Sequence, residues 1–266
     1  YEEADLASKA KTEFLNRMSH DIKTPINGVM GMLEIIRRNM DDRERVEECL
    51  GKIQLSTRHL LELVNDVLDM GRIETTQEKG RMEAFDLEQL MTETSSLVEA
   101  QLAETGIRHY RHREGIRHTD LTGNPLHLRQ IMINLLSNAI KYNKPGGRID
   151  TYAKELSCDG KQAFYEFGIT DTGIGMQKEF VKNKLFQPFT QEKTDARTQY
   201  KGSGLGMSIV KGLIESMNGS IQVESVPGEG TTFTFQLPFL LDDTACSNRK
   251  REQTAETDAA GMKILV

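Results

Sequence analysis

The first 78 residues repeat apolar side chains at the spacing of long helices, and this repeat constrains the fold more than any other feature. Between residues 5 and 38 the apolar positions alternate steps of three and four, the heptad pattern of a helical bundle. The pattern stops at residues 39–42 and resumes over residues 46–71. It predicts two long helices in an antiparallel hairpin. One hairpin cannot bury a stripe this long, so we expect two copies to form a four-helix bundle.

The same segment carries most of the charge of the chain. Residues 1–78 contain 11 basic and 16 acidic residues, a net charge of −5, and the net charge of all 266 residues is −6. A solvated outer face on a dimeric stalk is the simplest interpretation. Proteins that bind nucleic acid carry the opposite excess, so we expect no nucleic-acid partner.

Residues 79–240 follow other periods and predict a second domain. A strand is expected to end at Phe85-Asp86 and to lead into an N-capped helix to about residue 105. Asn124-Pro125 opens a second helix to about residue 142, and a third covers about 205–217. Further strand-like segments cover 107–116, 148–156, 163–170, 220–226 and 231–237. This order predicts a two-layer α/β sandwich. The chain as a whole is therefore expected to be α+β, with a helical hairpin over 1–78, the sandwich over 79–240 and a polar linker over 241–262.

Two observations bear on location. No apolar run approaches the roughly 18 residues that span a bilayer, and no signal peptide opens the chain. The cysteines, Cys49, Cys158 and Cys246, are widely separated, as free thiols of a reducing compartment are. We expect a cytoplasmic segment without direct membrane contact, and any membrane anchor would precede Tyr1.

His20 lies away from the apolar stripe of the first predicted helix. At about 100° per residue it points roughly 200° from Met18 and Ile22, which disfavours a core histidine. Asp21 follows it directly, and Thr24 lies one turn further on the same face. An exposed imidazole beside a carboxylate is a candidate nucleophile with its base, and an ordinary surface histidine is the alternative.

The other histidines indicate less. His109, His112 and His118 lie in a polar stretch without the cysteines or carboxylates of a metal site. The sequence His112-Arg113-Glu114 resembles part of a serine/threonine kinase catalytic loop, but the Asn, the Asp-Phe-Gly and the Lys-bearing strand are missing. We therefore disfavour a metal site at these histidines and reject the kinase-loop interpretation.

Two glycine clusters in the second domain indicate a phosphate-bearing ligand. Residues 171–176 (Asp-Thr-Gly-Ile-Gly-Met) follow a predicted strand, and residues 202–207 (Gly-Ser-Gly-Leu-Gly-Met) open a predicted helix. Glycines let backbone N–H groups approach phosphate, and a helix N-terminus favours anions. No Walker A sequence is present. Before these clusters, one helix face carries amides that suit Mg²⁺ and a lysine that suits phosphate: Asn134, Asn138, Lys141 and Tyr142.

With these motifs the chain resembles the cytoplasmic core of a two-component sensor histidine kinase, with its dimerisation domain and its Bergerat-type ATP-binding domain. The resemblance extends from about residue 5 to residue 240. Six motifs occur in the family order: the phosphoacceptor box 14–25, the Asn box 134–142, the first Gly box 171–176, the Phe box 186–189, the second Gly box 202–206 and the closing segment 228–233.

The resemblance implies a protein-histidine kinase that uses ATP and Mg²⁺. His20 would attack the γ-phosphate and Asp21 would accept its proton. The phosphate would pass to an aspartate of a response-regulator receiver domain, and Thr24 would position water for dephosphorylating that receiver. Residues 262–266 resemble the first strand of a receiver domain, which would start at residues 263–266, and this resemblance implies a hybrid kinase. The dimerisation domain of the family implies that the chain functions as a homodimer through its helical hairpin.

The resemblance also assigns the ATP site residue by residue. Asn138 would hold Mg²⁺, with Asn134, Lys141 and Tyr142 beside the triphosphate. Asp171 would accept from the adenine amino group, and Gly173 and Gly175 would allow close approach of the base. The remaining expected contacts are Arg197 in a lid over residues 187–203, the backbone of Gly204, Leu205 and Gly206 at the phosphates, and Thr232 in the closing segment.

Two alternatives stay open at this point. The core could act mainly as a phosphatase of its regulator, or it could be a dimeric scaffold whose ATP site only senses nucleotide. Other ATPases with this nucleotide fold, of the gyrase, mismatch-repair and chaperone types, are disfavoured because none places a histidine-bearing helical hairpin in front.

Overall fold

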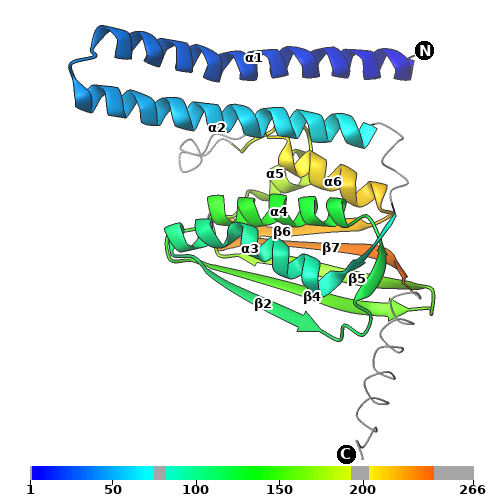
Figure 1. Cartoon of the computed structure of the whole chain (residues 1–266). Coiled ribbons are helices and arrows are strands. Elements are labelled where there is room, and N and C mark those ends of the chain that lie inside the picture. Colours follow the sequence, from blue (N-terminus) through cyan, green and yellow to red (C-terminus); the bar gives the residue numbers. More distant parts are fainter. Residues whose placement is uncertain (1, 75–81, 193–203, 243–266) are drawn as a thin grey trace, which may run out of the picture. The chain divides into compact units, whose positions relative to one another are not determined.

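The computed structural model describes residues 2–74, 82–192 and 204–242, which divide into two compact units. Residues 2–72 form the first unit, a pair of helices, and the described residues from Ile73 onward form the second, which contains a mixed sheet (Figure 1). The predicted α+β class is therefore confirmed. None of the helices in these ranges is long and apolar enough to cross a membrane.

The first unit consists of α1 (Glu2–Arg38) and α2 (Arg43–Glu74), joined by a connection of four residues. Local hydrogen bonds define this connection. The side chain of Asn39 donates to the carbonyl of Ile35 at 2.8 Å, and the carboxylate of Asp42 accepts from the N–H of Arg45 at 3.1 Å. Asp42 thereby caps the N-terminus of α2. A connection this short makes the two helices antiparallel.

Each helix of the hairpin carries two apolar stripes. The less exposed stripes follow steps of four and three: Met18, Ile22, Pro25, Val29, Met32 and Ile36 on α1, and Cys49, Ile53, Ser56, Leu60 and Leu63 on α2. These faces meet, because a Cβ at Gly28 would lie 3.9 Å from Ser56 Oγ. Leu63 on α2 is almost fully buried, whereas Leu61 is 60% exposed. Both stripes have the same period, so the pattern alone did not separate them.

The second unit is built on one seven-stranded sheet in the order β1-β3-β7-β5-β4-β2. The seventh strand, β6, pairs with the first part of β7, whereas β3 pairs with its end. All neighbours are antiparallel except β2 and β4. The strands are β1 (Glu83–Asp86), β2 (Arg108–Glu114), β3 (Asp120–Gly123), β4 (Arg148–Cys158), β5 (Gln162–Asp171), β6 (Ser220–Val226) and β7 (Gly230–Leu241). The central strands β5 and β7 pair over their whole shared length, which fixes the register of the residues at their ends.

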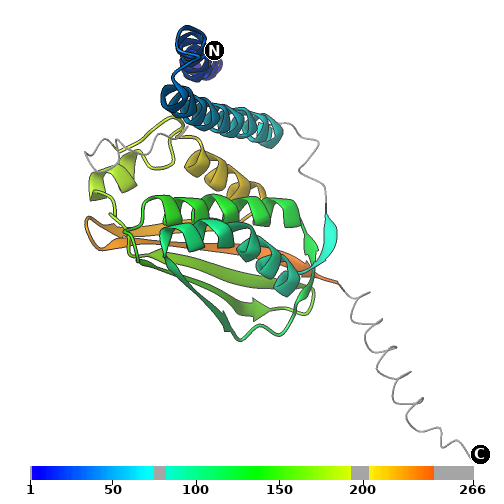
Figure 2. The same cartoon turned by 60° about the vertical axis from the view of Figure 1, so that its left-hand side comes forward.

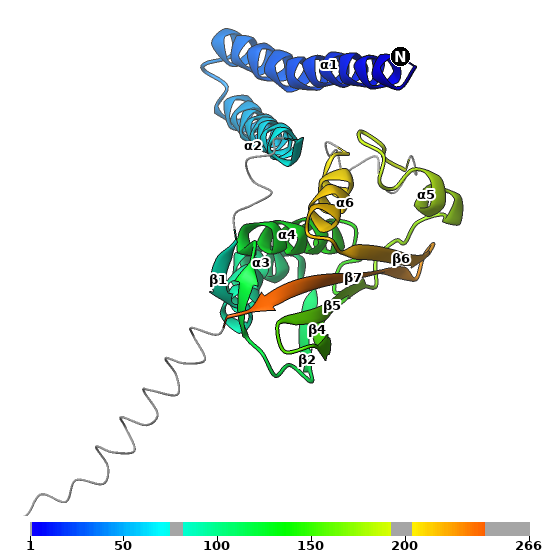
Figure 3. The same cartoon turned by 90° about the vertical axis from the view of Figure 1, so that its right-hand side faces the viewer.

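Helices α3 (Leu87–Thr105), α4 (Pro125–Lys141) and α6 (Gly206–Ser216) cover one face of the sheet (Figures 2 and 3). No helix of the described residues covers the other face, which we call the open face. Asp86 and Asn124 cap α3 and α4, as their positions in the sequence predict. The core between the layers is apolar, with the rings of Phe167 and Phe235 stacked 5.0 Å apart.

The structure adds two short elements that the sequence patterns did not predict, β3 and α5 (Lys178–Asn183). Both are too short for a reliable period. β3 is defined by its pairing with β1 and β7 rather than by local sequence. The described part ends at residue 242, and Leu241, the first residue of the predicted linker, is the last residue of β7. Residues 243–262 of the predicted linker and the predicted receiver strand lie outside the described residues.

Candidate nucleotide and phosphoacceptor sites

Asp171 is a buried carboxylate at the last position of the central strand β5. Asp171 is only 9% exposed, and its Oδ1 accepts a hydrogen bond from the N–H of Gly173 at 2.8 Å. A buried carboxylate requires polar partners. Asp171 therefore lies where the first Gly box folds back over the strand end, as the sequence predicted.

The glycines of the first Gly box are required by close backbone contacts. A Cβ at Gly173 would lie 2.3 Å from the carbonyl oxygen of Tyr142, and one at Gly175, whose φ is +63°, would lie 1.9 Å from the carbonyl oxygen of Val226. Between them, the N–H of Ile174 donates to the Tyr142 carbonyl at 3.0 Å. The first Gly box is thereby held between the end of α4 and the end of β6.

The turn between β6 and β7 closes this arrangement from the other side. A Cβ at Gly230 would lie 1.9 Å from the carbonyl oxygen of Asp171, and the N–H of Gly228 donates to the carbonyl of Ile174 at 2.8 Å. The Nζ of Lys144 donates to the carbonyl of Gly228 at 2.5 Å. Segments separated by more than 80 residues in the sequence thus frame the carboxylate of Asp171.

Helix α4 contributes the predicted polar face, and all four of its predicted residues are half-buried: Asn134, Asn138, Lys141 and Tyr142. The Nδ2 of Asn134 is buried and has no hydrogen-bond partner in the described part of the chain. The Nδ2 of Asn138 donates to Met207 Sδ at 3.6 Å, and a thioether is a weak acceptor. Leaving a buried amide unpaired costs about 1–3 kcal/mol, so this face is suited to a polar ligand.

The donor set fits a nucleotide-bound Mg²⁺ better than a metal held by protein alone. The described residues contain no group of three His, Cys, Asp or Glu side chains that could hold a metal ion. Mg²⁺ usually takes few protein ligands and completes its shell with phosphate and water oxygens. An amide oxygen of Asn138, next to the unpaired amide of Asn134, is a suitable protein ligand of this kind.

The N-terminus of α6 supplies the second Gly box. Gly204 has a φ of +71°, and a Cβ there would lie 2.9 Å from the carbonyl carbon of Phe189. Leu205 is fully buried, and α6 begins at Gly206 without a side-chain hydrogen bond at its cap. Uncapped N–H groups at a helix N-terminus favour a phosphate. Arg197 and most of the predicted lid lie outside the described residues.

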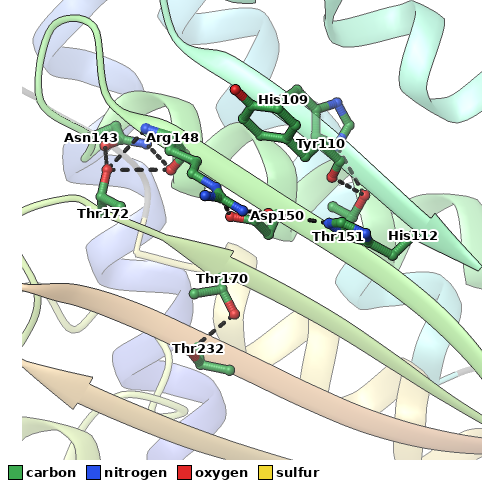
Figure 4. Close-up of polar contacts among 10 residues, drawn as sticks. All are labelled: His109, Tyr110, His112, Asn143, Arg148, Asp150, Thr151, Thr170, Thr172 and Thr232. Carbon is green, nitrogen blue, oxygen red and sulfur yellow. Dashed lines mark hydrogen bonds and ion pairs between the residues drawn. The ribbon is translucent and has the colours of Figure 1, made fainter.

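Thr231, which precedes the predicted Thr232 in the closing segment, lies opposite Asp171. Asp171 and Thr231 are register partners on β5 and β7, so their side chains share one face of the sheet. Thr232 pairs with Thr170 instead, with their Oγ1 atoms 3.1 Å apart (Figure 4). The alternation of Thr231 with the buried Phe233 is a sequence signal that could have identified Thr231.

Ser225 of β6 is a second residue that the sequence patterns missed. Its Oγ accepts from the N–H of Met176 at 2.8 Å and lies 2.9 Å from Thr231 Oγ1 and 3.0 Å from the carbonyl of Gly230. It therefore ties the end of the first Gly box to the start of β7. No local sequence pattern distinguishes it from other serines.

The phosphoacceptor box lies within α1. His20 and Asp21 belong to this helix, and their side chains lie outside the described part of the structure. The neighbouring residues define the faces of the helix: Met18 is 4% exposed, whereas Ser19, Lys23 and Thr24 are exposed. Thr24 therefore lies on the exposed side, as predicted.

The histidines of the second domain have structural partners. His118 Nδ1 lies 2.8 Å from Glu155 Oε1, and His109 Nε2 lies 3.0 Å from Thr151 Oγ1. Burial, and next the charge of Arg111, lower the pKa of His109. These contacts place His109 and His118 in hydrogen bonds within the second unit.

Two family models match the chain in the order of its two units. Residues 10–76 match the His Kinase A (phospho-acceptor) domain, and residues 123–241 match the histidine kinase-, DNA gyrase B- and HSP90-like ATPase. The match over residues 10–76 contains His20, and the match over residues 123–241 contains Asn134, Asn138 and Asp171.

Among curated proteins, the autoinducer 2 sensor kinase/phosphatase LuxQ of Vibrio vulnificus is 30% identical over 268 residues, which cover 99% of this chain and 31% of LuxQ. The circadian input-output histidine kinase CikA of Synechococcus elongatus is 38% identical over 244 residues, which cover 88% of this chain and 31% of CikA. The chain thus spans about a third of the length of these relatives.

Solved structures show the same fold. Full-length ShkA in complex with AMPPNP matches with a TM-score of 0.62 at 29% identity, over 86% of this chain and 46% of that one. The histidine kinase ThkA in complex with the response regulator protein TrrA matches with a TM-score of 0.65 at 22% identity, over 90% of this chain and 65% of that one.

Proposed function

Because the chain belongs to the two-component sensor histidine kinases, we propose that it phosphorylates His20 with the γ-phosphate of ATP and passes the phosphate to a receiver aspartate. The observation that carries this proposal is the arrangement around Asp171. Its buried carboxylate lies beside two glycines that admit no side chain, and α4 next to it holds an unpaired buried amide at Asn134.

The chemistry assigned to the chain is simple. A ring nitrogen of His20 attacks the γ-phosphorus, a nitrogen–phosphorus bond forms, and the bond to the bridging oxygen of ADP breaks. Asp21 takes the proton from the other ring nitrogen. Mg²⁺, held by Asn138 and the phosphates, would neutralise charge on the leaving group. The chain supplies mainly alignment, because phosphoryl transfer is largely dissociative.

Nucleotide binding is divided among the segments described above. We assign Asp171 to the adenine amino group, with Gly173 and Gly175 beside the base. Asn134, Lys141 and Tyr142, together with Arg197, are assigned to the phosphates, where the N-terminus of α6 at Gly204–Gly206 also contributes N–H groups. The Nζ of Lys141 lies 5.4 Å from the centre of the Tyr142 ring, and this cation–π contact keeps the ammonium close to this end of α4.

Labelling tests the kinase activity. Incubation with γ-labelled ATP and Mg²⁺ should give an acid-labile label on the chain that is absent in His20→Gln. His59→Gln, which removes the other histidine of the hairpin, is the matched control and should keep the label. A label that persists in His20→Gln would contradict the proposal, and normal ADP binding without any label would favour a nucleotide-sensing scaffold.

The exposed stripe of the hairpin supports a homodimer. Ile26, Met30 and Leu33 on α1, and Leu50, Leu61 and Val64 on α2, are each between 39% and 63% exposed. On both helices this stripe is displaced by about a quarter turn, in the same sense, from the stripe that faces the partner helix. In an antiparallel pair such stripes lie on the same side, so they form one continuous apolar face. A second hairpin is the occupant we propose.

A phosphatase activity toward the receiver is the second function we propose, because Thr24 is exposed one turn from His20. The relative LuxQ is named a sensor kinase/phosphatase. Thr24→Ala should slow dephosphorylation of the receiver and spare labelling of His20. Equal loss of both activities would contradict a separate role for Thr24. We also propose a cytoplasmic location, which the free thiols of Cys49 and Cys158 support.

A further inference from the structure

The side chains of Asn143 and Thr172 tie together the two loops on which the ATP site depends. Asn143 follows the end of α4, and Thr172 follows Asp171. The Oγ1 of Thr172 donates to Asn143 Oδ1 at 3.2 Å and accepts from the N–H of Arg148 at 2.9 Å, while Asn143 Nδ2 donates to the carbonyl of Arg148 at 3.1 Å (Figure 4). Both side chains thus bond the backbone of one residue.

Arg148 is a firm anchor for these bonds. It opens β4, between β2 and β5, and its guanidinium bonds both carboxylate oxygens of Asp150. The guanidinium also lies 4.6 Å from the centre of the Tyr110 ring. Asp150 in turn bonds His112 Nε2 at 3.3 Å. The anchor therefore extends over two strands, β4 and β2, and Figure 4 shows it as a continuous set of contacts on the open face.

The two tied loops determine where Asp171 lies relative to α4. The N–H of Thr172 donates to the carbonyl of Arg148 at 3.1 Å, and two residues later Ile174 bonds the carbonyl of Tyr142 at the end of α4. Gly173, which bonds the carboxylate of Asp171, lies between these two bonds. A loop without the bonds of Asn143 and Thr172 would let the carboxylate move with respect to the amides of α4.

We propose that Asn143 and Thr172 are positioning residues for recognition of the base. They hold the carboxylate of Asp171 at a fixed place relative to α4, so that one nucleotide can meet Asp171 with its adenine and α4 with its phosphates. This inference rests on the proposed function. It predicts that loss of these bonds weakens selection of the base more than binding of the phosphates.

The test compares two nucleotides on the whole 266-residue chain by titration calorimetry with Mg²⁺. Inosine diphosphate carries a carbonyl where ADP carries the amino group, so at that position of the base only ADP can donate to Asp171. In Thr172→Val and Asn143→Ala the affinity for ADP should fall about 10-fold, the equivalent of one hydrogen bond, and that for inosine diphosphate should stay unchanged. The double variant should be no worse than either single variant, because both remove one connection.

Two further variants separate positioning from stability. Thr172→Ser keeps the hydroxyl and should restore the preference for ADP. Tyr152→Phe is the control: it removes a hydrogen bond to Glu166 that joins β4 to β5 on the open face, away from the two loops. It should leave the affinities for both nucleotides unchanged. Equal weakening of both nucleotides, or unchanged ADP binding in both variants, would overturn the inference. A wild-type chain that binds neither nucleotide would overturn the proposed function, and the inference with it.

Discussion

Asp171 and Thr231 face each other across β5 and β7, whereas Thr170 and Thr232, one residue along each strand, face each other on the opposite side of the sheet. Asp171 and Thr231 are both buried, at 9% and 7% exposed. The pair therefore brings a carboxylate and a hydroxyl together at the end where the first Gly box begins. This relationship decides which threonine of the closing segment lies beside Asp171.

Thr231→Val should weaken ADP binding about 5- to 10-fold, because it removes a hydroxyl beside Asp171 without changing the side-chain volume much. Thr232→Val should have a smaller effect, since its hydroxyl lies on the open face with Thr170. Calorimetric titration of ADP into each variant checks this order. A larger loss at Thr232 than at Thr231 would contradict the placement of the two side chains.

Asp171→Asn should abolish the preference of the chain for ADP over inosine diphosphate. The amide keeps the size of the side chain but replaces a charged acceptor with a neutral one, and a hydrogen bond to a charged group contributes about 1.5–3 kcal/mol. ADP affinity should fall about 10- to 100-fold, as calorimetry would show. An unchanged preference in this variant would mean that another residue recognises the base.

Gly175→Ala should prevent nucleotide binding and lower the melting temperature of the second unit. A Cβ at this position would lie 1.9 Å from the Val226 carbonyl oxygen, and the φ of +63° is unfavourable for alanine. Gly51→Ala is the matched control, because it lies in a helix with no atom within 4 Å of a new Cβ. It should raise helix stability by about 0.5–1 kcal/mol. Calorimetric melting separates the two results.

Glu155→Gln should remove a part of the acid sensitivity of folding. The Glu155 side chain is 6% exposed, and it accepts from the N–H groups of Arg117 and His118 at 2.7 and 3.1 Å. Burial alone would raise its pKa, but these N–H groups and the His118 side chain lower it below the usual value of 4.5.

Because the folded pKa of Glu155 is the lower one, its stabilisation is present above about pH 4.5 and is lost as the pH falls through the folded value. Urea unfolding at pH 7 and at pH 3 should show a loss of about 1–2 kcal/mol for the variant at pH 7 and a smaller loss at pH 3. Glu104→Gln, at an exposed position, should match the wild type at both pH values. A loss independent of pH would contradict the role of the charge.

Leu61→Lys should raise the dissociation constant of the dimer by at least about 10-fold, since it places a charge in the exposed apolar face of the hairpin twice per dimer. Leu55→Lys is the control. It is 69% exposed and lies on the far side of α2 from both stripes, so its dimer should be unaffected. Sedimentation velocity over a dilution series measures both. Equal weakening by the two variants would argue against the proposed face.

Much of the fold could be predicted from local patterns. The caps at Asp86 and Asn124, the strand alternation and the heptad steps each depend on neighbours within one turn or one strand, so they identified the hairpin and most elements of the sheet domain. Elements such as β3 could not be predicted this way, since four residues have no reliable period and depend on pairing with other strands.

The candidate site divides in the same manner. The sequence by itself predicted which residues bear the chemistry. Spacing singled out the off-stripe His20 and the amide face that holds Asn138, and the resemblance to histidine kinases implied the role of Asp171. Only the tertiary structure decided which distant residues meet them. Thr231 lies at Asp171 because β5 and β7 pair in one register, and Asn143 meets Thr172 because both loops end at Arg148. Register and loop contacts arise from packing across many residues, and no local spacing encodes them.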